Sequence, residues 1–209
     1  MSEINSLIKG YHAYHTVDYR RDEALLQSLA EKGQSPKAMV ISCCDSRIEP
    51  SSILGTLPGD LFMVRNVANL VPPCAADDRH HGTSAALEYA ITQLHIPNII
   101  IMGHAMCGGI KALVDGVLDD SNDSSFISNW IEIAKDAKEN VSCCGKDGEG
   151  LQRAVEQASI LNSLENLMTF PFIEERVADG RVQLHGWYFD FSTGELFSYD
   201  KEKDTFINL

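Results

Sequence analysis

The chain has 209 residues, of which 30 are Asp or Glu and 17 are Lys or Arg, so its formal net charge is −13. This acidic balance argues against nucleic acid or an anionic membrane as the main partner, because both require clustered positive charge. Hydrophobic residues make up 44% of the chain and charged residues 22%, a balance that is typical of a globular protein and argues against intrinsic disorder.

The N-terminal region carries no recognisable targeting signal. It begins Met1-Ser2-Glu3 and lacks the basic and apolar regions of a signal peptide and the Arg/Ser-rich composition of a transit peptide. No apolar run reaches the roughly 18 residues needed to span a bilayer. We therefore expect a cytoplasmic protein, in which thiols placed near His and Asp indicate metal binding or catalysis rather than disulfides.

Strand and helix patterns alternate along the chain. Residues 3–32 predict a helical arm, and helical patterns follow at 83–94, 110–117, 126–140 and 151–168. Short apolar runs predict buried strands at 38–43, 61–66, 99–102 and 182–189, and a last strand at 195–199. The order predicts one α/β domain over residues 1–209, with a central mainly parallel sheet, flanking helices and an antiparallel edge strand. We expect the N-terminal helical arm (1–33) to pack on a second subunit.

Chemically reactive residues follow two of these strands. Cys43-Cys44-Asp45-Ser46-Arg47 comes after the first strand, and a segment containing His104 and Cys107 comes after the third. Ligands of open α/β sheets bind at the carboxyl ends of the strands, so we expect Cys43, His104 and Cys107 to converge. Two thiolates and one imidazole with an open fourth position are typical of a catalytic zinc site, and predict one Zn²⁺ per chain.

A zinc site with two thiolates requires a further group that assists the zinc-bound water. Two thiolates cancel the charge of Zn²⁺, so a bound water is acidified less than the pKa of about 7 reached with three imidazoles. Asp45 and Arg47 lie on the segment that carries Cys43. If they are paired, Arg47 keeps Asp45 ionised and oriented, and Asp45 can accept a hydrogen bond from zinc-bound hydroxide.

These motifs resemble those of the β-class carbonic anhydrases. The resemblance rests on Cys-x-Asp-x-Arg at 43–47, His-x-x-Cys-Gly-Gly at 104–109, Arg65-Asn66-Val67-Ala68-Asn69 and the stretch 82–89, and it covers roughly residues 33–199. It implies reversible hydration of CO2 to bicarbonate and a proton by zinc-bound hydroxide. Cys43, His104 and Cys107 would be the zinc ligands, and Asp45 and Arg47 the catalytic pair. It also implies a homodimer or higher homo-oligomer with active sites at the subunit interface.

The plant-like members of that class have a substrate pocket, which maps onto Gln34, Phe62, Val67 and Tyr89, with Gly108 beside it. Apolar Phe62 and Val67 suit CO2, and the Gln34 amide suits bicarbonate.

One departure separates the chain from a bacterial subgroup. That subgroup binds inhibitory bicarbonate with Trp, Arg and Tyr, whereas the chain keeps Arg65 but has Val40 and Phe189 at the other two positions. We predict that this inhibitory site is absent and that the fourth zinc position is open rather than filled by Asp45.

Two other functions remain open at this point. The same scaffold could hydrolyse COS or CS2, which are linear and apolar like CO2. Alternatively, Cys43, Cys44 and Cys107 could form a zinc or thiol-switch interaction site without catalysis, although a purely structural zinc site needs no Asp45–Arg47 pair.

Several other polar residues have simpler interpretations. We expect Cys44 to pack in the core, because strand alternation turns it away from Cys43. Cys143 and Cys144 are interpreted as accessory loop thiols. His80, His81 and Tyr89 are candidates for proton transfer to buffer.

Overall fold

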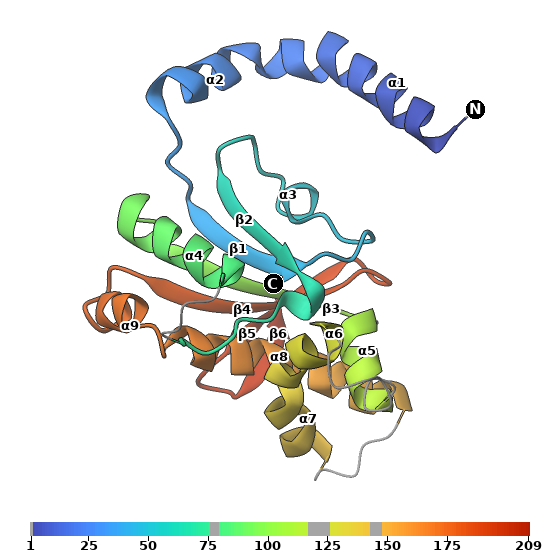
Figure 1. Cartoon of the computed structure of the whole chain (residues 1–209), viewed down its shortest axis with the longest axis vertical. Coiled ribbons are helices and arrows are strands. Elements are labelled where there is room, and N and C mark those ends of the chain that lie inside the picture. Colours follow the sequence, from blue (N-terminus) through green and yellow to red (C-terminus); the bar gives the residue numbers. More distant parts are fainter. Residues whose placement is uncertain (1, 76–79, 117–125, 143–147) are drawn as a thin grey trace.

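The computed structural model describes residues 2–75, 80–116, 126–142 and 148–209 (Figure 1). Its centre is a six-stranded sheet in the order β2-β1-β3-β4-β5-β6. The strands are β1 (Ala38–Cys43), β2 (Leu61–Asn66), β3 (Asn98–His104), β4 (Gln183–Asp190), β5 (Glu195–Asp200) and β6 (Thr205–Asn208). The first four pair in parallel, while β5 and β6 are antiparallel to their neighbours, so the predicted fold class is confirmed.

Helices flank this sheet and precede it. They are α1 (Glu3–Thr16), α2 (Asp18–Lys32), α3 (Pro50–Ile53), α4 (Gly82–Glu88), α5 (Gly108–Asp115), α6 (Phe126–Ile131), α7 (Lys135–Ser142), α8 (Gly148–Leu167) and α9 (Pro171–Ala178). Two short 3₁₀ turns, η1 (Val67–Asn69) and η3 (Glu132–Ala134), and one π-turn, η2 (Tyr89–Gln93), complete the described elements. None of the described helices is long and apolar enough to cross a membrane.

Side chains on both faces of the central strands are buried. Met39 and Ile41 of β1 join a core cluster with residues of α4, η2, α8 and α9, whereas Ala38 and Val40 join a second cluster on the opposite face. This two-sided burial explains why β1 and β3 are continuous apolar runs in the sequence rather than alternating ones.

The N-terminal arm is helical, as predicted, and is divided into two helices. It consists of α1 and α2, which lie apart from the sheet and contain no buried residue (Figure 1, blue). The break follows Thr16, whose hydroxyl donates hydrogen bonds to the carbonyls of His12 and Ala13. Such back-bonding by Thr bends helices, which accounts for the change of direction at Val17.

Other boundaries also differ from the predictions. The helix expected at 83–94 changes at Tyr89 into a π-turn, in which the Leu94 N–H donates to the Tyr89 carbonyl. Strand β6 follows the strand predicted to be the last. Helices α3 and α9 had no prediction, although each begins at a proline, a residue favoured at the first helical position.

Candidate metal centre

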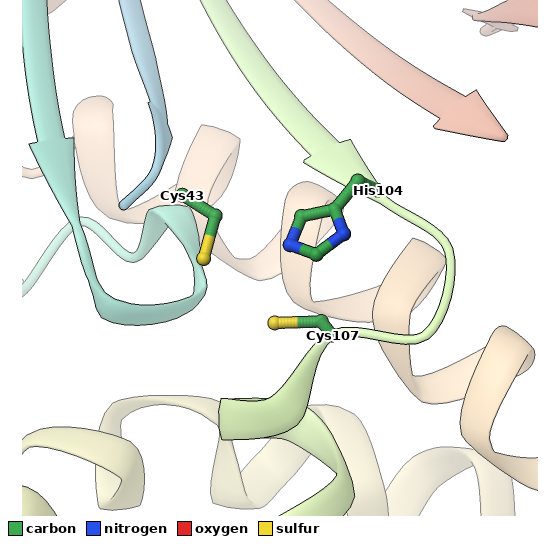
Figure 2. Close-up of side chains that lie close together, drawn as sticks. All are labelled: Cys43, His104 and Cys107. Carbon is green, nitrogen blue, oxygen red and sulfur yellow. The ribbon is translucent and has the colours of Figure 1, made fainter. Parts of the chain in front are cut away.

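Three donor side chains converge where β1 and β3 end. Cys43 is the last residue of β1, His104 is the last residue of the adjacent β3, and Cys107 caps the N-terminus of α5. Their ligand atoms all lie within 4.8 Å of one another, and all three residues are buried (Figure 2). The predicted convergence is therefore confirmed.

The turn between His104 and Cys107 depends on unusual backbone geometry. Met106 has a φ of 54°, a left-handed conformation that non-glycine residues adopt at a cost. Just beyond the turn, a Cβ on Gly109 would lie 2.8 Å from Val67 Cγ1 and 3.2 Å from Ala68 Cβ. Only glycine allows α5 and η1 to approach this closely.

The donor set fits a zinc ion. His104 Nδ1 lies 2.8 Å from the Ala105 carbonyl, so it carries the proton and leaves the Nε2 lone pair available. Nε2 is buried and has no hydrogen-bond partner among the described residues. The hydrogen bond from Cys107 lowers the pKa of the Cys43 thiol, and the Ala68 N–H also donates to Cys43 Sγ at 3.3 Å. A tetrahedral ion would use all three donors and keep one position free.

Asp45 and Arg47 form a bidentate pair beside these donors. Arg47 Nε donates to Asp45 Oδ1 at 2.9 Å, and Nη2 donates to Oδ2 at 2.7 Å. These bonds hold the pKa of Asp45 well below its usual range, so the carboxylate is ionised at neutral pH. Asp45 Oδ2 lies 3.9 Å from His104 Nε2, and Arg47 also donates to the Met106 carbonyl at 2.8 Å. The carboxylate is thus fixed next to the metal-binding donors.

A buried carboxylate that the sequence did not reveal supports the Cys107 backbone. Glu156 of α8 is only 3% exposed, and its Oε1 accepts the Cys107 N–H at 2.8 Å. Gln152 donates to the same oxygen and the Tyr188 hydroxyl donates to Oε2. Burial raises the pKa of Glu156. A lone Glu on a helix usually faces solvent, so no sequence pattern indicated this contact.

The four residues expected to line a substrate pocket do not meet in one chain. Val67 lies in η1 beside Gly109, near the metal donors. Phe62 pairs with Met39, four residues before Cys43. This places Phe62 about 13 Å from the level of Cys43, toward the amino ends of the strands. Its ring lies 6.1 Å from that of Tyr89, which is exposed. Gln34 precedes β1 and is also exposed.

The structure corrects the interpretation of one cysteine. Cys44 was expected in the core, but it is exposed, because β1 ends at Cys43 and strand alternation no longer applies. Its N–H donates to the Asn66 carbonyl at 2.9 Å. His80 is exposed ahead of α4, whereas Cys143 and Cys144 lie outside the described residues.

Comparison with known proteins identifies the family. The model of the family described as carbonic anhydrase matches residues 38–196. Beta carbonic anhydrase 3 of Arabidopsis thaliana is 37% identical over 199 residues, covering 93% of this chain and 76% of that protein. The chain belongs to the β-class carbonic anhydrases. Beta carbonic anhydrase 5 of A. thaliana, a chloroplastic protein, is 43% identical over 182 residues, which are 86% of this chain and 59% of that relative.

Solved structures of β-carbonic anhydrases have the same fold. The β-carbonic anhydrase CcaA superimposes with a TM-score of 0.93 at 32% identity, covering all of this chain and 93% of its own. One of two tetrameric β-carbonic anhydrases from Sordaria macrospora superimposes with a TM-score of 0.79 at 28% identity, covering 93% of this chain and 95% of its own. The N-terminal helices and the terminal strands therefore belong to a fold that relatives share.

The chloroplastic relative overturns one prediction. We expected a cytoplasmic protein because the first residues lack a targeting signal, but a relative that is 43% identical is chloroplastic. The predicted location was therefore wrong. The chain spans 59% of that relative, so the composition of its first residues does not decide the compartment.

Proposed function

We propose that the chain catalyses the reversible hydration of CO2 to bicarbonate and a proton, with one zinc ion held by Cys43, His104 and Cys107. The observation that carries this proposal is the buried Cys-His-Cys cluster next to the ionised Asp45–Arg47 pair, in a member of the carbonic anhydrase family. Bound zinc supplies the Lewis acidity that makes a water nucleophilic near neutral pH.

The chain's own residues orient the reactants. Both Asp45 oxygens accept hydrogen bonds from Arg47, so the carboxylate cannot rotate freely and presents its remaining lone pairs toward the donor cluster. An ionised Asp45 can only accept hydrogen bonds, and it therefore favours a partner that donates one. Val67 places an apolar side chain close to Cys43 and Cys107, which suits CO2. We assign Asp45 and Arg47 the catalytic roles on this basis.

Stopped-flow CO2 hydration on protein of known zinc content tests this function. We expect about one zinc per chain, fast hydration, and a fall in kcat of about 10²- to 10⁴-fold in Asp45→Ala, the range typical of a positioned acid–base group. The control is Asp179→Ala, which removes an exposed carboxylate paired with Arg181 after α9. Full activity in Asp45→Ala, or zinc without hydration in the wild type, would refute the assignment.

We also propose that the active unit contains at least two copies of the chain. One helical face of α1 exposes a row of apolar side chains, Ile4, Leu7, Ile8, Tyr11 and Tyr14, each 45–69% exposed. A contiguous exposed row of apolar side chains marks a surface that another protein or another copy covers. A second copy would also explain why Gln34, Phe62 and Tyr89 lie far from their own metal donors, since they could line the site of the partner. In support, the related S. macrospora enzymes are described as tetrameric.

Sedimentation velocity tests this assembly. Leu7→Glu with Tyr11→Glu places charges on the apolar row and should shift the protein toward monomer. Lys9→Glu, elsewhere on α1, is the matched control for added charge. A wild-type protein that sediments as a monomer at micromolar concentration would exclude the proposed assembly.

A further inference from the structure

Arg65 of β2 donates hydrogen bonds to three backbone carbonyls at the end of β1 and in the segment that follows it. Its Nε donates to the Cys43 carbonyl at 3.0 Å, and its Nη2 donates to the carbonyls of Asp45 at 2.8 Å and Ile48 at 2.9 Å. Its Nη1 donates to Glu49 Oε2 at 3.1 Å. One planar guanidinium therefore fixes four points along seven residues.

The segment held in this way depends on scattered hydrogen bonds rather than on regular secondary structure. Residues 44–49 form neither a helix nor a strand. Within it, the Arg47 N–H donates to Asp45 Oδ1 at 2.9 Å and the Ile48 N–H donates to the Asp45 carbonyl at 3.3 Å. The Cys44 N–H donates to the Asn66 carbonyl, and Arg47 Nη2 donates to the Met106 carbonyl. The Glu49 carbonyl accepts from the first turn of α3. The same segment carries the first metal ligand, Cys43, and both members of the Asp45–Arg47 pair. Its path therefore depends on single contacts, and Arg65 donates more hydrogen bonds to it than any other residue outside the segment does.

We propose that Arg65 is a positioning residue for the reaction proposed above, on which this inference rests. By fixing the carbonyls of Cys43 and Asp45, it sets where the Cys43 thiolate and the Asp45 carboxylate lie relative to His104. Arg65 touches neither the donor atoms nor the carboxylate of Asp45, so it acts only through the backbone. This role differs from the bicarbonate-binding role of the corresponding arginine in the bacterial subgroup.

The geometry requires arginine rather than any cation. Only a guanidinium presents donors in a rigid, planar fork that can reach carbonyls on two sides. A lysine ammonium keeps the charge but is a point donor on a flexible stem, so it can bond part of this set and fix it less well. The charge-conserving variant Arg65→Lys therefore separates geometry from electrostatics.

The experiment compares Arg65→Gln and Arg65→Lys with the wild type as full-length holoproteins. The matched control is Arg181→Gln, which removes an arginine that bonds Asp179 and Glu175 at a distant surface. Three quantities are measured: the rate of zinc release to a chelator, the visible spectrum of the Co²⁺-substituted protein, and kcat and KM for CO2 hydration. Groups that orient metal ligands typically change metal affinity or activity by 10- to 100-fold.

We expect Arg65→Gln to release zinc about 10- to 100-fold faster, to alter the Co²⁺ bands, and to lower kcat by a similar factor with KM little changed. Arg65→Lys should lie between Arg65→Gln and the wild type, and Arg181→Gln should match the wild type. Wild-type zinc release and kcat in Arg65→Gln would overturn the proposal. If Arg65→Gln does not fold, wild-type values in Arg65→Lys would overturn it instead. If the wild type does not hydrate CO2, the proposed function fails, while zinc release and the Co²⁺ spectrum still test Arg65.

Discussion

A single added methyl group at Gly109 tests how the metal centre depends on close packing. In Gly109→Ala, the new Cβ would lie 2.8 Å from Val67 Cγ1 and 3.2 Å from Ala68 Cβ, so η1 must move by at least several tenths of an ångström. Overpacking of this kind costs about 1–3 kcal/mol of folding free energy. Movement of η1 also weakens the hydrogen bond from the Ala68 N–H to Cys43 Sγ, and a bond to a charged group contributes about 1.5–3 kcal/mol.

Overpacking together with partial or full loss of that bond predicts a decrease of roughly 1–6 kcal/mol in the free energy of unfolding, measured by urea denaturation of the zinc-loaded protein. Zinc release should also be faster than in the wild type. The control is Gly150→Ala in α8, where a Cβ meets nothing within 4 Å. Because alanine favours a helix over glycine, that variant should be as stable as the wild type or up to about 1 kcal/mol more stable. A Gly109→Ala protein with wild-type stability and zinc release would refute the packing argument.

Three further predictions concern buried charge and pH. Glu156→Leu leaves the Cys107 N–H and the Tyr188 hydroxyl without their acceptor, so it should lower the free energy of unfolding by roughly 2–6 kcal/mol. Glu156→Gln should cause a smaller loss, because the Tyr188 hydroxyl can turn to accept a hydrogen bond from the new amide. Equal losses of the two variants in urea denaturation would contradict this. Hydrogen bonds from Ser192 and from Arg153 lower the pKa of Asp190, so its ionised form stabilises the fold above the unfolded value of 3.8, and this contribution disappears as pH falls through the lower folded value. The stability deficit of Asp190→Asn should therefore be larger at pH 7 than at pH 3, and a deficit that does not change with pH would refute the linkage. Finally, two thiolates cancel the charge of the zinc ion, so the hydration rate should rise with pH above neutrality; a flat profile between about pH 6 and 9 in stopped-flow assays would count against this.

The strands that carry the site could be predicted because both faces of each are buried. Runs such as Ala38–Cys43 are continuously apolar, and this pattern has few alternatives in a chain of this composition. The short strand β6 was missed because it lies at the edge of the sheet beside β5 and three of its four residues are exposed. The break in the arm depends on the local hydrogen bonds of Thr16, which periodicity cannot detect.

The metal donors could be predicted for a topological reason. Parallel strands end at the same edge of a sheet, so residues that follow β1 and β3 meet there whatever their separation in sequence. Glu156 and Arg65 could not be assigned their contacts in this way. Glu156 lies 49 residues from Cys107, and the carbonyls that Arg65 holds lie 17 to 22 residues away, without a local pattern connecting them. Support for a site is a tertiary property, even where the site itself follows strand order.

The placement of the predicted pocket residues has a consequence for assembly. A single chain builds the metal donors and the Asp45–Arg47 pair at the carboxyl end of β1. Phe62 lies about 13 Å away along the same sheet, next to exposed Tyr89. No side-chain rotation covers that distance, so these residues either play no part in the reaction or act on the site of another copy. Phe62→Ala distinguishes these cases, because it leaves the metal donors of its own chain untouched. If the pocket is shared between copies, Phe62→Ala should raise KM or lower kcat without faster zinc release. A mixed oligomer of Phe62→Ala and Asp45→Ala chains should then regain activity, but only at sites that take Asp45 from the first chain and Phe62 from the second.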